Sequence, residues 1–336
     1  MDQKTRIAFV GCGGMAEQHS EALAARTDVS LVGFTDISLP RAQQMAQRRG
    51  TNAKAFNDAK TMFDAVELDG AYFCLPPSAH GAELEAVEHN VPFFVEKPVN
   101  LYLDQASRIA LGAEEKRLLT SVGYMNRYRA GVQKAKRLLT DDPVILALGG
   151  WIGGVPKLSD EVGIWTWWVQ KDKSGGQFHE QVTHTVDLLR YFCGEVLQVH
   201  AFAARGLNKG TPPLYSTEDA SVVNLRFESG AIANLWAGAC ANAGGGIALD
   251  LYANDVTARF SGWEFSAELF RTGEEEPEHI PGEEAIFAVE DDAFVQAIRK
   301  NDPSLVKSSY ADGVKTAAVT LAANRSMDTG KPVTVD

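Results

Sequence analysis

The stretch RIAFVGCGGMA, residues 6–16, places an apolar run directly before a glycine-rich turn and the start of a helical pattern. Its glycines and Ala16 match the G-x-G-x-x-G/A pattern that is typical of dinucleotide sites between a strand and a helix. Gly11 permits the tight turn, Gly13 lets the backbone approach a pyrophosphate, and the helix N-terminus faces negative charge. We therefore expect a dinucleotide beside the residues of this turn, which are Gly11, Cys12, Gly13, Gly14 and Met15.

A glycine-rich turn by itself can be only a tight loop, and Asp36 supplies an independent check. The second apolar run ends at Thr35-Asp36, and Asp36 lies 20 residues beyond Ala16. A carboxylate at this place accepts hydrogen bonds from the adenosine ribose and repels a 2′-phosphate. Asp36, with Ile37 beside it, predicts NAD as the cofactor. NADP stays open because Arg41, one turn into the next helix, would weaken that preference.

From residue 6 to about residue 122, short apolar runs alternate with longer amphipathic stretches. The pattern predicts strands at 7–10, 31–35, 71–75, 93–95 and 119–122, and helices at 15–25, 39–49, 58–66, 79–89 and 103–116. Alternating strands and helices are typical of a parallel sheet. We expect an α/β fold in which residues 1–123 form a doubly wound, Rossmann-type NAD(P)-binding domain.

The pattern changes after Gly123, and several strand runs follow one another with few helices between them. We expect strands at 144–152, 197–205, 221–227, 231–239 and 333–335, and helices at 128–139, 178–192, 285–300 and 310–327. Such an order predicts a mixed or antiparallel sheet in a second domain, residues 124–336, that binds substrate. The acidic run at 273–278 is typical of a solvated hairpin or loop.

Composition excludes several classes of partner. The 336 residues carry a formal net charge of −12, which repels nucleic-acid backbones and anionic membranes. No apolar run approaches the roughly 20 residues that span a bilayer, and the first residues lead straight into a strand, so we expect a cytoplasmic protein. The four cysteines have no paired spacing and predict neither disulfides nor a zinc cluster: Cys12, Cys74, Cys193 and Cys240.

The stretch FCLPPSAH, residues 73–80, ends a strand at the edge where open α/β sheets bind ligands. Leu75 and Pro76 are therefore candidate cofactor contacts. His80 has two interpretations, because it is either an ordinary residue of a helix first turn or a group that faces the nicotinamide half of the cofactor.

The stretch FFVEKP, residues 93–98, is a buried strand that ends in two charges and a proline. Glu96 and Lys97 would lie at the crevice, where both are candidate cofactor contacts, and Pro98 restricts the backbone at the exit. A solvated Glu-Lys surface pair is the alternative. A partly desolvated Lys97 would instead hydrogen-bond an alcohol oxygen and stabilise developing alkoxide charge during hydride transfer.

The stretch SGGQFHEQVTHTVDLLR, residues 174–190, gathers polar groups at the start of a predicted helix. Glu180, His184 and Asp187 are spaced to project from one helix face, whereas His179 and His184 diverge by roughly 140°. Zinc proteases need histidines four residues apart, so we expect no metal. A histidine supported by carboxylates suits a general base, although the same group can be a hydrogen-bond network without catalysis.

Two further positions are candidate substrate contacts. Trp168 closes the aromatic run WTWW, residues 165–168, which belongs either to the core or to an apolar wall against a sugar face or cofactor ring. Arg127, near the predicted domain junction, either reaches a polyol or caps the interface.

The combination of motifs resembles the Gfo/Idh/MocA family, named for glucose-fructose oxidoreductase and inositol dehydrogenase. The resemblance spans almost the whole chain, and its most specific part is the tripeptide Glu96-Lys97-Pro98. Its other parts are residues 11–16, Asp36, Pro76-Pro77 with His80, Gly123-Tyr124 with Arg127, Gly175-Gly176 leading to His184 and Asp187, and the closing residues 330–333.

The resemblance implies a Rossmann domain followed by an α/β domain with an open, mostly antiparallel sheet, often used for assembly into a homodimer or homotetramer. It also implies oxidation or reduction of a hydroxyl of a sugar, cyclitol or related polyol, with Lys97 as the catalytic or substrate-orienting lysine and His184 as the proton-transferring histidine. Many relatives have Asp-x-Gly-x-His where this chain has EQVTH, residues 180–184. Glu180 keeps a carboxylate one turn before His184, but on a longer arm.

The sequence thus predicts an NAD(P)-dependent dehydrogenase or reductase acting on CH-OH groups. His184 accepts the hydroxyl proton, Lys97 polarises the oxygen, and Glu180 or Asp187 supports the pair while hydride passes to the nicotinamide. Lys97, Arg127, Trp168, Glu180 and His184 would contact the substrate. Two other functions remain open, namely a dinucleotide-sensing protein without turnover and an NAD-dependent glycoside hydrolase, which also occurs in the broader family.

Overall fold

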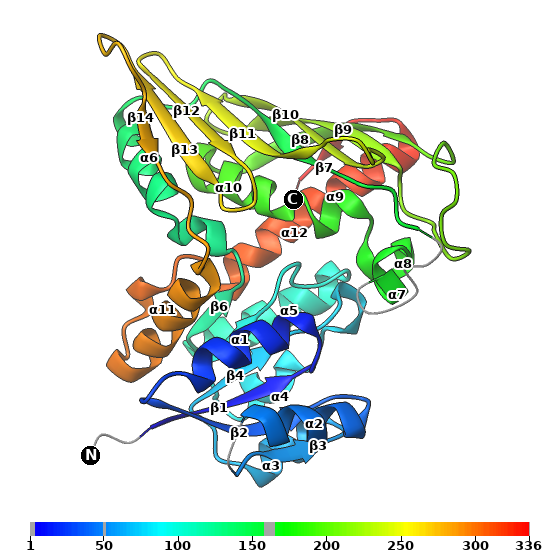
Figure 1. Ribbon diagram of the computed structural model, residues 1–336, viewed down its shortest axis with the longest axis vertical. Helices are drawn as coiled ribbons and strands as arrows, with labels where there is room; N and C mark the ends of the chain where they lie inside the picture. Colours follow the sequence, from blue (N-terminus) through cyan, green and yellow to red (C-terminus); the bar gives the residue numbers. More distant parts are fainter. Residues whose placement is uncertain (1–3, 50–51, 158–164, 336) are drawn as a thin grey trace. The chain divides into compact units, whose positions relative to one another are not determined.

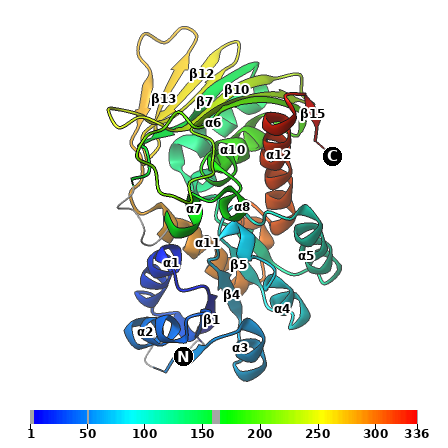
Figure 2. The same cartoon turned by 90° about the vertical axis from the view of Figure 1, so that its right-hand side faces the viewer.

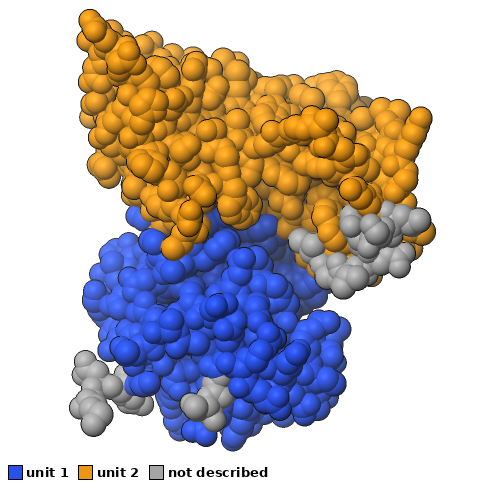
Figure 3. Space-filling view, in the orientation of Figure 1, with its two compact units in different colours: residues 1–125, 287–314 blue, residues 126–286, 315–336 orange. Residues whose placement is uncertain are grey.

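The computed structural model describes residues 4–49, 52–157 and 165–335, and the chain forms two compact units (Figure 3). Unit 1 comprises residues 1–125 and 287–314, and unit 2 comprises residues 126–286 and 315–336. The sequence analysis places a single boundary near Gly123, whereas the structure returns a distant segment to unit 1. Apolar burial is the physical reason, because Phe294 and Val295 of this segment are buried in the same cluster as Phe9.

Unit 1 is built on a six-stranded sheet in which every neighbouring pair is parallel. The spatial order is β3-β2-β1-β4-β5-β6. The strands are β1 (Thr5–Val10), β2 (Val29–Thr35), β3 (Lys54–Phe56), β4 (Gly70–Phe73), β5 (Phe93–Val95) and β6 (Thr120–Val122). The arrangement confirms the predicted doubly wound sheet. Strand β3 was not predicted, because this three-residue edge strand lacks a long apolar run.

Helices cover both faces of this sheet, as Figure 2 shows. One face packs against α1 (Gly14–Ala24), α2 (Leu39–Arg49) and α11 (Ile286–Lys300), whose apolar side chains share a cluster with Phe9, Phe34, Tyr72 and Phe94. The other face packs against α3 (Ala59–Ala65), α4 (Glu83–Glu88) and α5 (Leu103–Glu115). Burial on both faces explains why the strands read as continuous apolar runs.

The strand order sets the place where a ligand can bind in unit 1. Since β1 pairs with β2 on one side and β4 on the other, the chain after β1 and the chain after β4 leave the sheet in opposite directions. This topological switch point, at the carboxyl ends of the strands, is where open α/β sheets hold ligands. The segments beginning at Gly11, Asp36, Cys74 and Glu96 all follow strands at this edge.

Unit 2 is built on a nine-stranded sheet of order β14-β13-β12-β11-β7-β10-β9-β8-β15 (Figure 1). Its neighbours are antiparallel except for β7 and β10, which are parallel. The strands are β7 (Leu146–Gly153), β8 (Val196–Ala204), β9 (Ala220–Phe227), β10 (Ile232–Ala239), β11 (Gly246–Tyr252), β12 (Val256–Ser261), β13 (Ser266–Arg271), β14 (Glu278–Ile280) and β15 (Val333–Thr334). The mostly antiparallel sheet is confirmed, although β11 to β14 were not predicted.

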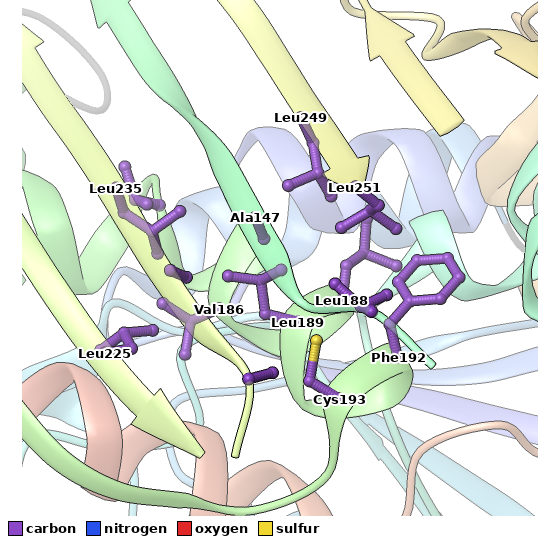
Figure 4. Packing of buried hydrophobic residues seen from close by; sticks show 14 of the residues in the cluster. Ala147, Val186, Leu188, Leu189, Phe192, Cys193, Leu225, Leu235, Leu249 and Leu251 are labelled. Atoms are coloured by element: carbon purple, nitrogen blue, oxygen red, sulfur yellow. The ribbon is translucent and has the colours of Figure 1, made fainter. Parts of the chain in front are cut away.

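Within unit 2, helices lie on one face of the sheet. They are α6 (Ala130–Asp141), α10 (Thr183–Cys193) and α12 (Tyr310–Thr329), which starts in unit 1. Figure 4 shows Val186 and Leu189 of α10 directed toward Leu235 and Leu251 of the sheet. Each such side chain contributes about 1.5–3 kcal/mol when it leaves water. The opposite face carries exposed apolar side chains instead, among them Phe202, Val222 and Ile232.

The helix predicted over residues 178–192 is two helices in the structure, α9 (Gln177–Glu180) and α10. The break lies at Gln181 and Val182, where the β-branched residues Val182 and Thr183 follow one another. The predicted common helix face therefore does not hold for Glu180, which ends α9, whereas His184 and Asp187 do share α10. The shorter elements are α7 (Trp165–Trp168), α8 (Lys171–Ser174) and the 3₁₀ helices Pro77–Ala79, Met125–Tyr128 and Pro303–Leu305.

Across the described ranges, each helix is too short or too polar to cross a lipid bilayer.

Candidate functional site

The turn after β1 contains one position, Gly11, at which the fold itself requires glycine. Gly11 has a φ of +90°, and its N–H donates to the Thr35 carbonyl oxygen at 2.8 Å. A Cβ atom at Gly11 would lie 2.3 Å from the carbonyl oxygen of Cys74, which is closer than atoms can approach. Backbone conformation and packing therefore both demand glycine here.

The next two glycines differ. Apart from their chain neighbours and the helix's own backbone, no atom of the described residues lies within 4 Å of the position that a Cβ would take at Gly13 or Gly14. Gly13 also has an ordinary φ of −87°. The fold therefore does not need glycine at Gly13, yet a group approaching the start of α1 would need the space. This open space in front of a helix N-terminus fits the pyrophosphate of a dinucleotide.

Asp36, at the end of β2, is 7% exposed and holds the glycine-rich turn in place. Its Oδ2 accepts from the Cys12 N–H at 3.0 Å, and its Oδ1 accepts from the Ser38 N–H at 2.8 Å. Arg41 Nη1 lies 3.5 Å from Oδ2 on a side chain that is 57% exposed. Oδ1, which accepts only from Ser38 among the described residues, has a further lone pair for a ribose hydroxyl, while the neighbouring Ile37 is fully open to solvent.

His80 follows β4 and is oriented by a buried carboxylate. Its Nδ1 hydrogen-bonds Glu83 Oε1, and Glu83 Oε2 accepts from the Gly81 N–H at 2.6 Å. In the neutral ring with its proton on Nδ1, the other ring nitrogen, Nε2, is an acceptor. Nε2 is buried and has no hydrogen-bond partner among the described residues. Leu75 and Pro76, by contrast, are half-buried residues of the same loop.

The segment after β5 joins Glu96 to Lys97. Glu96 is buried, and its Oε2 accepts from the Lys97 backbone N–H at 3.1 Å. The Lys97 side chain belongs to a half-buried residue, and the peptide bond between Lys97 and Pro98 is cis. Glu96 therefore contacts the backbone of the predicted catalytic lysine and does not point freely into solvent.

His19 is the residue of this region that the sequence analysis missed. Its fully buried ring lies between Glu96, with Nε2 to Oε1 at 2.9 Å, and Asp291, with Nδ1 to Oδ1 at 2.8 Å. Burial opposes a charge on the ring, but the two carboxylates outweigh it and raise the pKa of His19 well above 6.5. Its spacing was a usable signal, because His19 lies three residues after Ala16 on the face that α1 buries.

In unit 2, Glu180 is fixed by an aromatic residue. The indole Nε1–H of Trp168 donates to Glu180 Oε2 at 2.7 Å, and both residues are buried. Trp165 packs edge-on against Trp168, with ring centroids 5.1 Å apart. The aromatic run therefore serves partly as core, and its indole also orients a carboxylate that the sequence analysis assigned to the site.

Asp187 and Arg127 form a buried, bidentate ion pair. Arg127 Nε donates to Oδ2 at 2.8 Å and Nη2 donates to Oδ1 at 2.7 Å, with side chains 6% and 1% exposed for Arg127 and Asp187. Thr316 Oγ1 donates to Oδ1 at 3.3 Å, and the Arg127 guanidinium lies 5.1 Å from the centre of the Tyr191 ring. The geometry makes this pair a support for α10, on which the half-buried His184 lies.

The predicted site residues thus fall into two groups, one in each unit. Unit 1 brings together the glycine turn, Asp36, His80 and the Glu96-Lys97 segment along one sheet edge, and unit 2 pairs Trp168 with Glu180 and Arg127 with Asp187. A joint action of Lys97 and His184 stays a prediction. Over the described parts of the chain, no group of histidines, cysteines and acids is placed to hold a metal ion. All four cysteines are free thiols.

Comparison with known proteins yields matches in both units. The family model GFO_IDH_MocA, described as an oxidoreductase family with an NAD-binding Rossmann fold, matches residues 5–124. A second model, the GFO/IDH/MocA C-terminal domain, matches residues 154–259.

Relatives and solved structures agree with this match. The scyllo-inositol 2-dehydrogenase (NAD(+)) of Bacillus subtilis is 25% identical, over 69% of this chain and 66% of its own. The myo-inositol 2-dehydrogenase of Thermotoga maritima is also 25% identical, over 68% and 66%. The alignments thus span about two thirds of these relatives' length. The WlbA dehydrogenase of Bordetella pertussis, solved with NADH and UDP-GlcNAcA, shares the fold with a TM-score of 0.83 and 20% identity over 99% of both chains.

Alanine at Gly13 tests the open space before α1. We expect Gly13→Ala to fold normally and to bind NADH at least about tenfold more weakly, roughly 1.4 kcal/mol, because the new methyl group occupies the pyrophosphate approach. Calorimetric titration with NADH and thermal melting measure the two quantities. Gly11→Ala is the matched control and should lower the melting temperature, since its Cβ meets the Cys74 carbonyl. Wild-type NADH affinity in Gly13→Ala would contradict the assignment.

Proposed function

Since this chain belongs to the Gfo/Idh/MocA oxidoreductase family, we propose that it transfers hydride between NAD and a hydroxyl or carbonyl carbon of a sugar, cyclitol or related polyol. The observation that carries the proposal is the Glu96-Lys97 segment, in which a half-buried lysine residue follows a strand that ends at the same sheet edge as the glycine turn. The inositol dehydrogenases among the relatives support a polyol as the substrate class.

The residues of unit 1 fit the cofactor in three places. The space beside Gly13 and Gly14 suits the pyrophosphate, Asp36 suits the adenosine ribose, and the buried acceptor Nε2 of His80 suits an amide N–H donor. When bound, NAD supplies the carbon that accepts the hydride. The protein's own task is then to orient the alcohol and to manage its proton.

Lys97 and His184 take the chemical roles in this proposal. The Lys97 ammonium donates a hydrogen bond to the substrate oxygen and stabilises the negative charge that develops there. His184 accepts the hydroxyl proton, because a neutral imidazole is basic enough near neutral pH. Glu180, held by Trp168, binds a substrate hydroxyl, and Asp187 acts through its Arg127 pair by holding α10 in place.

Removal of each chemical group tests these roles. We expect Lys97→Met and His184→Asn to lower turnover by about 10²–10⁴-fold, the usual range for a lost acid-base group, while NADH affinity changes only slightly. If both groups act on the same hydroxyl, the double variant loses much less than the product of the single losses. NADH formation is measured against a panel of inositols, aldoses, sugar acids and keto-sugars.

Lys60→Met is the control for this series, because Lys60 forms an exposed ion pair with Asp64 and should keep full activity. Wild-type protein that binds NADH but turns over no member of the panel would contradict the dehydrogenase. Glycosidase activity with copurified NAD would point to a hydrolase instead. If the loss of turnover in the double variant equals the product of the two single losses, Lys97 and His184 do not act on the same hydroxyl.

The choice of NAD over NADP rests on Asp36. We expect Asp36→Asn to keep an oxygen that accepts the Cys12 N–H, to bind NADPH roughly tenfold more tightly and to bind NADH slightly less well, since the charge that repels a 2′-phosphate is gone. Adding Arg41→Ala should reverse the gain, because Arg41 then no longer holds the phosphate. Fluorescence titrations with both cofactors measure this. Wild-type protein that already prefers NADPH would contradict the assignment.

The proposal includes self-association as a homodimer or homotetramer through the uncovered face of the unit 2 sheet. Phe202 and Val222 are register partners on β8 and β9, and their exposed fractions are 60% and 45%. Adjacent apolar side chains of this kind often mark an interface.

A charge placed on this face tests the association. We expect Phe202→Glu to reduce the mass measured by light scattering, because a carboxylate does not transfer from water into an apolar interface without a partner. Leu111→Glu, on the exposed side of α5, is the control and should leave the mass unchanged. A monomeric wild-type protein at micromolar concentration would contradict this part of the proposal.

A further inference from the structure

His19, Glu96 and Asp291 form a buried trio in unit 1 that the proposed chemistry does not use directly. The three residues come from α1, the end of β5 and α11, and their exposed fractions are 0%, 4% and 1%. Each ring nitrogen of His19 faces one carboxylate oxygen, at 2.9 Å for Glu96 and 2.8 Å for Asp291. The imidazole is thus held from both sides.

Hydrogen bonding at both nitrogens decides the protonation state of His19. A neutral imidazole carries one N–H and can donate to only one carboxylate, which leaves the other carboxylate against a lone pair. A doubly protonated ring donates to both. Burial disfavours that charge, but Asp291 and Glu96 together outweigh burial and raise the pKa of His19 well above 6.5.

The remaining groups around the ring agree with a cationic His19. Tyr72 of β4 packs 5.6 Å from it, and burial together with Asp291 raises the pKa of that phenol well above 10, so Tyr72 is neutral. Phe94 of β5 and Phe287 of α11 complete the surroundings with apolar rings. Glu290, also buried, precedes Asp291 on α11.

Glu96 connects this charge to the segment that carries the catalytic lysine. While Oε1 accepts from His19, Oε2 accepts from the Lys97 backbone N–H. Gly123 also packs closely here, since a Cβ at that position would lie 2.9 Å from Glu96 Oε1. The carboxylate therefore has one place to lie, between His19 and the Lys97 backbone.

We propose that His19 is a positioning residue whose imidazolium fixes the Glu96 carboxylate and, through it, the Lys97 backbone, with Asp291 anchoring the other side of the ring to α11. The inference rests on the proposed function only where Lys97 is called catalytic. The hydrogen-bonded chain itself is a property of unit 1. We assign its effect to turnover, because the three buried side chains bond to one another and to the Lys97 backbone.

Kinetics of matched variants test the catalytic consequence. We expect His19→Gln and Glu96→Gln each to lower kcat about 10–100-fold with KM and NADH affinity nearly unchanged, because Lys97 is misplaced while the binding surfaces remain. The double variant should lose no more than the worse single variant, since the two residues act as one unit. His89→Gln, which removes another histidine that pairs with an aspartate, Asp64, is the control and should keep wild-type kcat.

Two spectroscopic readouts test the chain without any substrate. Nitrogen NMR of ¹⁵N-histidine protein, with His19 identified by its absence in His19→Gln, should show a doubly protonated ring at neutral pH. The Lys97 amide proton should shift in both His19→Gln and Glu96→Gln but not in His89→Gln. A neutral His19 ring, or an unmoved Lys97 amide, would overturn the proposal even if the enzyme is active.

Stability supplies a pH signature that loss of packing alone does not produce. Because the pKa of His19 is higher in the folded protein than in the unfolded chain, its stabilising contribution is full below about pH 6.5 and is lost as the pH rises through the folded-state pKa. The melting-temperature difference between wild type and His19→Gln should therefore narrow as the pH rises. A difference that does not change with pH would count against an imidazolium.

The outcomes separate this inference from the proposed function. If the wild-type protein turns over no polyol, the proposed dehydrogenase activity is wrong. The NMR and melting results would then still decide the role of His19. Wild-type turnover together with full kcat in His19→Gln would overturn the positioning role and leave the dehydrogenase standing.

Discussion

The contact between Gly11 and the carbonyl of Cys74 is the constraint on which the cofactor side of this protein depends. It occurs where β1 and β4 run side by side and their continuations part, so the backbone has no room for a side chain. With the turn held there, the first turn of α1 opens onto unfilled space at Gly13. One steric condition thus sets the entry of the helix and leaves the open space that we assign to a phosphate group.

The acidic residues of the candidate site share one feature, because each carboxylate accepts a hydrogen bond from another group of the protein. Asp36 accepts from the glycine turn, Glu96 from His19, Glu180 from Trp168 and Asp187 from Arg127. A buried carboxylate without such a partner is costly, so these pairs keep the charges in fixed positions. These hydrogen bonds hold the carboxylates in place. In the proposed reaction, Lys97 and His184 are the groups assigned to the alcohol oxygen and its proton.

Much of unit 1 could be predicted from the sequence because its signals are local. The strand, the glycine turn and the helix are contiguous, and the charges of Glu96 and Lys97 directly follow an apolar strand. The partners of these residues are remote, however, and Asp291 lies 272 positions from His19. Periodicity and spacing carry no information about such a contact. The break at Val182 was missed for another reason, because the apolar spacing on its two sides looks continuous. Strands β11 and β12 carry an alternation of apolar residues at 246–261, which is a local signal for strands.

The return of α11 to unit 1 has a consequence for synthesis of the protein. When residue 125 leaves the ribosome, all six strands of the parallel sheet exist, but Tyr72 and Phe94 lack the ring of Phe294 that packs against them. Until Asp291 has been translated, His19 has only one of its two carboxylate partners, Glu96. The nucleotide-binding half, although first in the chain, is therefore completed only after most of unit 2 has been translated. The core of unit 1 is thus completed late, although most of unit 1 comes first in the chain.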